Sequence, residues 1–173
     1  EILLKTKPDS TLAKKAIYQI GRNFQDVAAY DKAADYYEQF ADKYPGEKEA
    51  STALYSASFF RRGLGDNDKA IKDVALFVKD YGGRHEFVDK AATVAFNQGQ
   101  IYESEKDNAR LLKHFQDYLK QWGSKGGVDH QVIAHVKIAD ILWRQSCPLP
   151  DGGINDACIE LKRERAGGAA RVA

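Results

Sequence analysis

Two segments of the chain repeat one another at an interval of about 37 residues, a period typical of repeat architectures. Both contain Asp-Lys-Ala near their start. They end with similar segments, Phe-Ala-Asp-Lys-Tyr-Pro-Gly at residues 40–46 and Phe-Val-Lys-Asp-Tyr-Gly-Gly at residues 77–83. Such repeats form stacked supersecondary units rather than one globular core. Because stacks of this kind present extended binding surfaces, the repeat favours a binding scaffold over an enzyme.

The apolar residues follow a helical period along most of the chain. They recur at three- and four-residue steps, which places them on one face of a helix, and turn signals such as Pro45-Gly46 separate the segments. Ser10 lies where it can cap the first helix. The sequence therefore predicts an all-α fold of about eight helices, with apolar faces in residues 12–24, 33–41, 50–60, 70–78, 87–102, 111–122, 132–142 and 157–161.

Charge and hydropathy exclude two classes of partner. Lys and Arg number 26 against 25 Asp and Glu, a formal net charge of +1, whereas a dedicated nucleic-acid surface needs a marked basic excess. No apolar run approaches the ~20 residues that span a bilayer. Neither Met nor a signal peptide is present, which favours a fragment or processed product whose parent chain carries neighbouring repeats.

The helix pairs resemble the tetratricopeptide repeat, whose period is about 34 residues. In the first copy Gly21 and Ala33 stand at the small positions where two helices cross, Tyr37 is the adjacent large residue, and Pro45 ends the repeat. The later copies match less closely, at positions Ala57, Phe60, Ala70, Gly99, Tyr102 and Ala139. The family's signature tryptophan is replaced by Ile17, Ala53 and Ala95.

This resemblance covers about residues 10–125 well and implies an α-solenoid of about eight antiparallel helices, with three repeat-like pairs and a divergent fourth. We expect residues 1–9 to be a tail or the end of a preceding repeat and residues 10–128 to hold the three pairs. Residues 129–166 would form a capping pair that begins with Asp129 as its cap, and residues 167–173 a frayed tail.

The amino-acid sequences of the repeats are similar to those of bacterial envelope members of the family. Tyr-Asp-Lys-Ala and Phe-Ala-Asp-Lys-Tyr-Pro resemble repeats in the Tol-Pal-associated coordinator and in outer-membrane assembly lipoproteins. The resemblance implies a periplasmic or outer-membrane-associated protein. A cytoplasmic location is the alternative, since cytoplasmic members of the family contain similar segments.

The two cysteines bracket a segment rich in Pro and Gly. Cys147 and Cys158 would order this loop if a disulfide joined them, which would require an oxidising compartment. Two reduced thiols, or a zinc site with His130 and His135, are the alternatives. The five-residue spacing of the histidines does not place both rings on one helical face, and no close Cys pair accompanies them.

In a stack of helix pairs, the first helix of each pair lines a concave groove. Counted from the small crossing residues, the predicted groove side chains are Lys15, Tyr18, Arg22, Gln25, Leu54, Ser58, Arg61, Phe96, Gln100, Glu103, Asp140 and Trp143. Aromatic residues and hydrogen-bond donors suit a peptide or a partner helix. The alternative for Tyr18, Leu54 and Phe96 is a role in contacts between neighbouring pairs. We interpret Arg22 and Arg61 as groove ligands, or else as ordinary solvated side chains.

No catalytic or cofactor motif accompanies the repeats. The four histidines are scattered, and no Ser or Cys nucleophile has a histidine placed by a recognisable motif. We therefore expect a non-catalytic scaffold, without cofactor, that binds a segment or helix of another protein within a cell-envelope complex. The alternative is a structural spacer or self-assembling module in a longer array.

Overall fold

The computed structural model describes residues 10–146, and this part of the chain consists of helices and turns without a strand. The predicted all-α class is confirmed. The elements are α2 (Thr11–Asp26), α3 (Tyr30–Lys43), α4 (Ala50–Gly63), α5 (Asn67–Tyr81), the short 3₁₀ helix η1 (His85–Phe87), α6 (Val88–Asn97), α7 (Gly99–Ser104), α8 (Asn108–Trp122) and α9 (Val128–Ser146).

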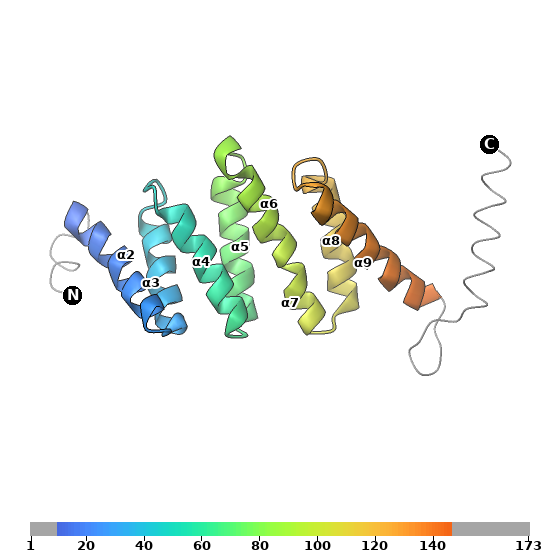
Figure 1. Cartoon of the computed structure of the whole chain (residues 1–173), viewed down its shortest axis with the longest axis horizontal. Helices are drawn as coiled ribbons and strands as arrows, with labels where there is room; N and C mark the ends of the chain where they lie inside the picture. The colour runs from blue at the N-terminus through green and yellow to red at the C-terminus, as the bar shows by residue number, and fades with distance from the viewer. Residues whose placement is uncertain (1–9, 147–173) are drawn as a thin grey trace.

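The helices stand side by side in a row, with α2 at one end and α9 at the other (Figure 1). Contacts between helices join mainly neighbours along the chain, as expected of a helical-repeat arrangement. We call α2, α4, α6–α7 and α9 the first helices, and α3, α5 and α8 the second helices. The first helices lie in the front layer of Figure 1, and the surface that they present is called the first-helix face.

Local signals set most of the helix boundaries. The Ser10 hydroxyl accepts a hydrogen bond from the Ala13 amide at 3.1 Å, which confirms the predicted cap of α2. Asp107 caps α8 in the same way through the Arg110 amide at 2.9 Å. The predicted cap at Asp129 is wrong, because α9 begins at Val128; Asp129 lies in the first turn, where the helix dipole favours a carboxylate.

The single long helix predicted for residues 87–102 is interrupted at Gln98. The Ile101 amide donates to the Gln98 carbonyl at 3.0 Å, a three-residue turn that is tighter than the α-helix. Gly99 follows at once, and a Cβ there would lie 2.7 Å from Cζ of Phe115 in α8. The break therefore lies next to a point where α7 comes too close to α8 for a side chain at Gly99.

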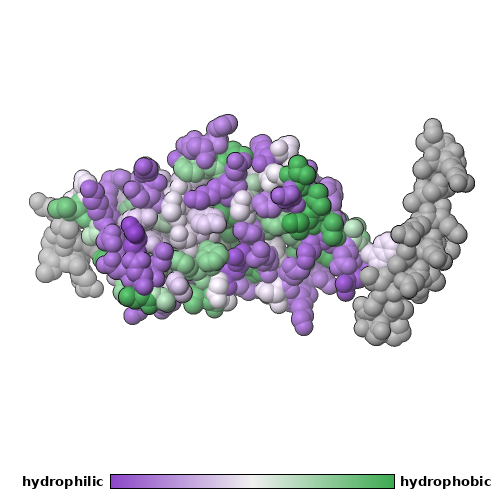
Figure 2. All heavy atoms as spheres, in the orientation of Figure 1, coloured by the Kyte–Doolittle hydropathy of each residue, from purple (hydrophilic) through white to green (hydrophobic). Residues whose placement is uncertain are grey.

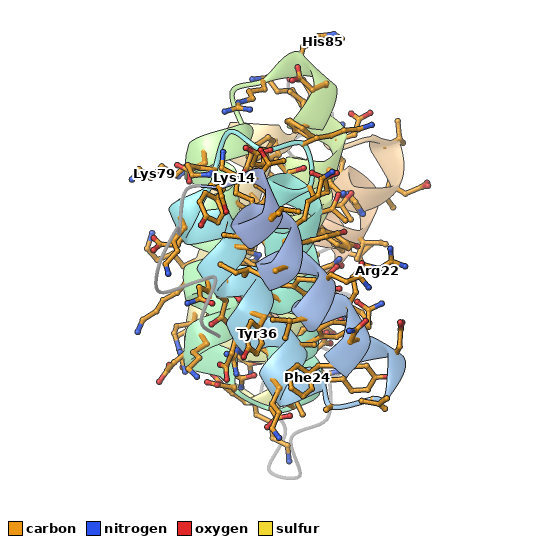
Figure 3. The ribbon with its side chains drawn as sticks, turned by 90° about the vertical axis from the view of Figure 1, so that its left-hand side faces the viewer. Lys14, Arg22, Phe24, Tyr36, Lys79 and His85 are labelled. Atoms are coloured by element: carbon orange, nitrogen blue, oxygen red, sulfur yellow. The ribbon has the colours of Figure 1, made fainter. Side chains whose placement is uncertain are left out.

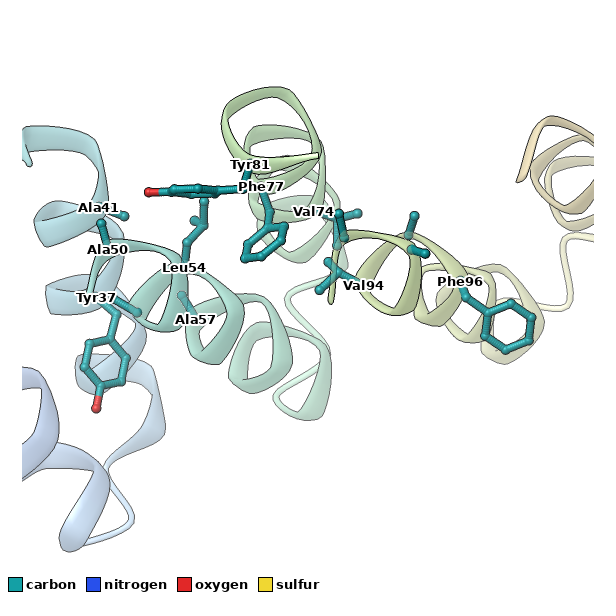
Figure 4. Packing of buried hydrophobic residues seen from close by; sticks show 14 of the residues in the cluster. Tyr37, Ala41, Ala50, Leu54, Ala57, Val74, Phe77, Tyr81, Val94 and Phe96 are labelled. Carbon is teal, nitrogen blue, oxygen red and sulfur yellow. The ribbon is translucent and has the colours of Figure 1, made fainter. Parts of the chain in front are cut away.

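Small residues at the helix crossings let large aromatic side chains fill the adjacent space. A Cβ on Gly21 would lie 2.8 Å from Cδ1 of Tyr37, so glycine is needed for this approach of α2 to α3. Figure 4 shows the same principle around α4, where Ala57 and Leu54 lie among Tyr37, Phe77 and other buried residues. The Tyr81 hydroxyl also donates to the Pro45 carbonyl at 3.1 Å, which joins the end of α5 to the turn between α3 and α4.

The apolar face predicted for α9 is mostly uncovered. Ala134 and Ile141 are buried and Ile138 is half-buried, because this side of the helix packs against α8. Ala139, which we expected at a helix crossing, is exposed. The expectation for Ala139 was wrong, because the side of α9 that packs against α8 carries Ala134, Ile138 and Ile141. The large apolar residues of α9 that remain exposed are Val128, Val132, Ile133, Val136 and Leu142.

Several predictions fall on residues 1–9 and 147–173, which lie outside the described residues. They are the N-terminal tail, the Cys147–Cys158 disulfide, the second helix of the capping pair and the frayed end. None of the helices within residues 10–146 is both long and apolar enough to cross a bilayer.

Candidate functional site

The structure places the predicted groove residues in three kinds of environment. Some are accessible on the first-helix face, some are half-buried, and some are part of the core. The exposed ones are Lys15, Arg22, Gln25, Gln100 and Glu103; the half-buried ones are Tyr18, Asp140 and Trp143; and the buried ones are Leu54, Ser58, Arg61 and Phe96.

The buried apolar members belong to the joints between helices. Leu54 is only 1% exposed. Phe96 stacks on His130 of α9 with a centroid separation of 4.2 Å and contacts the rings of Phe115 and Tyr118 in α8. Their burial favours the alternative of contacts between neighbouring pairs over a role as groove ligands.

Arg61 is a structural residue, so its predicted role as a groove ligand is wrong. Its side chain is 4% exposed and pairs with Asp35 and Glu38 of α3, the Glu38 carboxylate lying 2.9 Å from Nη2. A third carboxylate, that of Asp66 before α5, lies 3.6 Å from Nη1. The guanidinium thus joins α3, α4 and the following turn, and no part of it is left for a ligand.

Other predicted ligands are engaged with side chains of the same chain. Glu103 of α7 pairs with Lys137 of α9, and Asp140 pairs with Arg144 at 3.0 Å. Gln25 accepts a hydrogen bond from the Tyr37 hydroxyl at 2.7 Å. These contacts are on the surface, where a partner can exchange them at low cost.

Lys15 and Tyr18 line a wide depression at the α2 end of the row, with a volume of about 880 Å³. Its walls are α2 and the turn before α4, with the ring of Phe40 behind Tyr18 at a centroid separation of 5.2 Å. Leu12, 67% exposed, stands at its edge. The charged residues around it are Lys14, Lys15, Glu47, Lys48 and Glu49, with Lys14 and Glu47 paired at 2.7 Å.

A second, narrower hollow lies between α4 and α6–α7. Tyr55, Phe59 and Arg62 of α4 face residues 94–101 across it, and only about 20 Å³ can be reached by a water molecule, which is room for one or two waters. Phe59 is 54% exposed at its rim. A partner side chain would therefore lie on Phe59 rather than inside the hollow.

Two cations stand over aromatic rings around this hollow. The guanidinium carbon of Arg62 lies 5.3 Å from the centre of the Phe59 ring, and its Nη1 donates to the Asn97 carbonyl at 3.4 Å. Lys90 of α6 places its Nζ 4.9 Å from the centre of the Tyr55 ring. Such cation–π contacts hold the charges in place without neutralising them.

The sequence prediction missed Tyr55, Phe59 and Arg62 by one residue. Counting from Ala57 selected Leu54, Ser58 and Arg61, which the structure turns inward. The correct set follows a four- and three-residue spacing on the side opposite the small residues of α4, and that spacing was visible in the sequence.

Burial perturbs one acidic group next to the Arg61 network. Asp73 of α5 is 6% exposed, and its Oδ2 has no hydrogen-bond partner. Desolvation, helped by the nearby carboxylate of Glu38 and opposed by Arg61, raises the pKa of Asp73 to about 7. Burial also raises the pKa of Tyr37 and of Tyr118 to about 12, so both hydroxyls stay protonated at neutral pH.

The two histidines of the alternative zinc site, His130 and His135, do not belong to a ligand cluster within the described residues. Nδ1 of His130 lies 3.3 Å from the Tyr118 hydroxyl, and residues 10–146 hold no group of three His, Cys, Asp or Glu side chains suited to a metal. No protein-family model matches the chain, and no curated protein matches its sequence. What the site can bind therefore follows from its own shape and charge.

Proposed function

We propose that the chain is a non-catalytic scaffold that holds an extended segment or a helix of another protein against its first-helix face. The observation that carries this proposal is the wide depression on that face, which has an exposed apolar edge at Leu12 and donors at Lys15 and Lys48. Its volume of about 880 Å³ falls within the roughly 300–1,000 Å³ of typical ligand pockets.

Contacts within the chain that hold several side chains of this face support the same proposal. Tyr18 contacts the rings of Tyr37 and Phe40, and Tyr55 and Phe59 are each in contact with a cation. A surface whose side chains are already ordered loses little conformational entropy when a partner binds. We use the term groove for these two separate hollows taken together, the depression beside α2 and the narrower hollow between α4 and α6–α7.

We further propose that the row of helices is a tetratricopeptide-type α-solenoid, with α9 as the first helix of a fourth pair. Two helix crossings support this classification, because at each of them a glycine of the first helix, Gly21 or Gly99, leaves room for an aromatic ring of the second helix. The similarity of the repeat sequences to those of bacterial envelope proteins supports membership of a cell-envelope complex.

Mutation of the depression tests the binding function. An array of peptides from envelope proteins would be screened with the unchanged chain, with a Leu12→Ser/Lys15→Ala variant and with a Thr52→Ala control, which changes an exposed residue of α4 outside both hollows. We expect bound peptides to lose about tenfold or more in affinity only in the depression variant. Equal affinity for all three proteins would contradict binding in the depression.

A spacer or self-assembling module is the second candidate, and the exposed valines of α9 favour it. Val128, Val132 and Val136 are 73%, 55% and 60% exposed and recur every four residues, so they form an apolar stripe that a second copy could cover. Sedimentation velocity separates the candidates: a concentration-dependent dimer together with an inert peptide array supports the spacer.

A further inference from the structure

Building on the binding function proposed above, we propose that the groove takes an acidic segment of its partner, in which carboxylates flank an apolar side chain. The carboxylates would lie against Arg62 and Lys90, and the apolar side chain would lie on the exposed ring of Phe59. Charge distribution and exposed apolar surface carry this proposal independently of each other.

Charge is divided between the two layers of the first two pairs. The first helix α4 carries two arginines and no carboxylate, and α2 carries three basic residues against one acidic residue. The second helix α3 has the opposite balance, with four carboxylates against two lysines. Because Arg61 is buried and paired with carboxylates of α3, the accessible cations of these two first helices are Arg62 of α4 and, on α2, Lys15 and Arg22.

Three cations of the groove have accessible charge that is not paired with a carboxylate of the described residues. Within residues 10–146, no carboxylate lies within ion-pair distance of Arg62, Lys90 or Lys15. The narrow hollow has no Asp or Glu in its lining. A carboxylate brought to Arg62 would gain a charge-assisted hydrogen bond without displacing an existing one.

Exposed apolar groups alternate with these charges. Leu12 is 67% exposed at the edge of the depression, and Phe59 is 54% exposed at the rim of the narrower hollow. Figure 2 shows mainly hydrophilic residues over α2, and residues of intermediate hydropathy with hydrophobic patches over α4. The arrangement fits a segment in which apolar and acidic residues are close neighbours, rather than a uniformly charged polymer.

Short fluorescein-labelled peptides test the proposal by anisotropy titration. Each contains one phenylalanine, flanked by glutamates, by glutamines or by lysines; a glutamate peptide without phenylalanine and a single-stranded oligonucleotide complete the set. We expect the glutamate–phenylalanine peptide to bind about tenfold more tightly than the glutamine peptide, and the difference to shrink as salt screens the charges.

Two charge-matched double variants place the effect on the groove. Arg62→Gln/Lys90→Gln should abolish the preference for glutamate, whereas Lys72→Gln/Lys79→Gln, which removes the same charge from exposed positions of α5, should keep it. Figure 3 shows that Lys79 and Arg22 project from opposite sides of the molecule, so the control changes the other face. Circular dichroism would check that both variants are folded, and the salt titration of the unchanged chain gives a readout that needs no variant.

The outcomes separate this inference from the proposed function. Equal binding of the glutamate and glutamine peptides overturns the inference and leaves a peptide-binding scaffold. Binding of the phenylalanine-free peptide or the oligonucleotide as tightly as the full probe overturns it as well, because it would show unspecific attraction of anions. If none of the three phenylalanine peptides binds and the envelope-peptide array is also inert, the proposed function fails too.

Discussion

α4 and α9 are both first helices with several apolar residues, yet their surroundings differ. α4 lies inside the row and contacts α3 on one side and α5 on the other, so that Ala53, Leu54 and Ala57 are all buried. α9 is the last helix of the described chain and contacts α8. Five of its large apolar residues remain 43–73% exposed.

The difference shows that an apolar stripe identifies a face that can be covered, but not whether it is covered. In a repeat array each pair buries its apolar side against the next one, so the last helix keeps an open side. A second copy of the chain is a candidate to cover this side of α9. The predictions below test how different the two helices are.

Removal of a buried side chain from α4 should have the largest effect. Leu54→Ala leaves a cavity in the joint between pairs, and we expect the free energy of unfolding to fall by about 2–5 kcal/mol in urea denaturation. The matched change on α9, Val136→Ala, should cost less than about 0.5 kcal/mol. A cost as large as that of Leu54→Ala would show that the α9 stripe is covered in solution.

The ion pairs of the two helices should also differ. Arg61→Met removes the cation that joins α3, α4 and the α5 turn, and takes away the ion-pair partner of Asp35 and Glu38; we expect a loss of about 2–3 kcal/mol, because these carboxylates keep part of their hydration. Arg144→Met breaks the exposed pair with Asp140 on α9 and should change stability by less than about 0.5 kcal/mol. Similar losses for the two variants, measured by thermal unfolding, would contradict the structural role of Arg61.

The buried acid beside the Arg61 network should make stability depend on pH. The pKa of Asp73 rises from 3.8 to about 7 on folding, so its contribution is fully present below about pH 4, declines between pH 4 and 7, and is constant above that range. Asp73→Asn should therefore stabilise the chain by about 1–2 kcal/mol at pH 8, where the charged form is disfavoured, and much less at pH 4. Urea titrations at both pH values measure the difference; an equal effect at the two would refute the burial of an ionising group there.

Polar changes in the α9 stripe should have the smallest effect on stability. Val132→Asp/Val136→Asp replaces two exposed valines, so the free energy of unfolding should change by less than about 1 kcal/mol. The same variant should bind less of a hydrophobic dye and lose any concentration-dependent association. Unchanged association would exclude this stripe as the contact between copies.

Much of the fold was predictable because its causes are local. The three- and four-residue spacing of apolar residues, the cap at Ser10 and the turn at Pro45-Gly46 are properties of short segments, and they gave the all-α class and most helix positions. The break at Gln98 was not predicted; it lies next to Gly99, where a Cβ would meet the Phe115 ring of another helix, a contact that the local apolar spacing does not show.

Some properties of the groove follow from the sequence alone, and others depend on tertiary contacts. The sequence determined that α2 and α4 are amphipathic and that cations and aromatic residues share their polar sides, since helical period and residue chemistry fix both. The small residues of α4 mark its buried side in the sequence, but only the contacts with α3 show that a charged residue, Arg61, belongs to that side, because Asp35 and Glu38 pair with it. Arg62, the next residue in the chain, is only half-buried. A step of one residue turns a side chain by about 100° around the helix, so burial depends on which neighbours stand on each side.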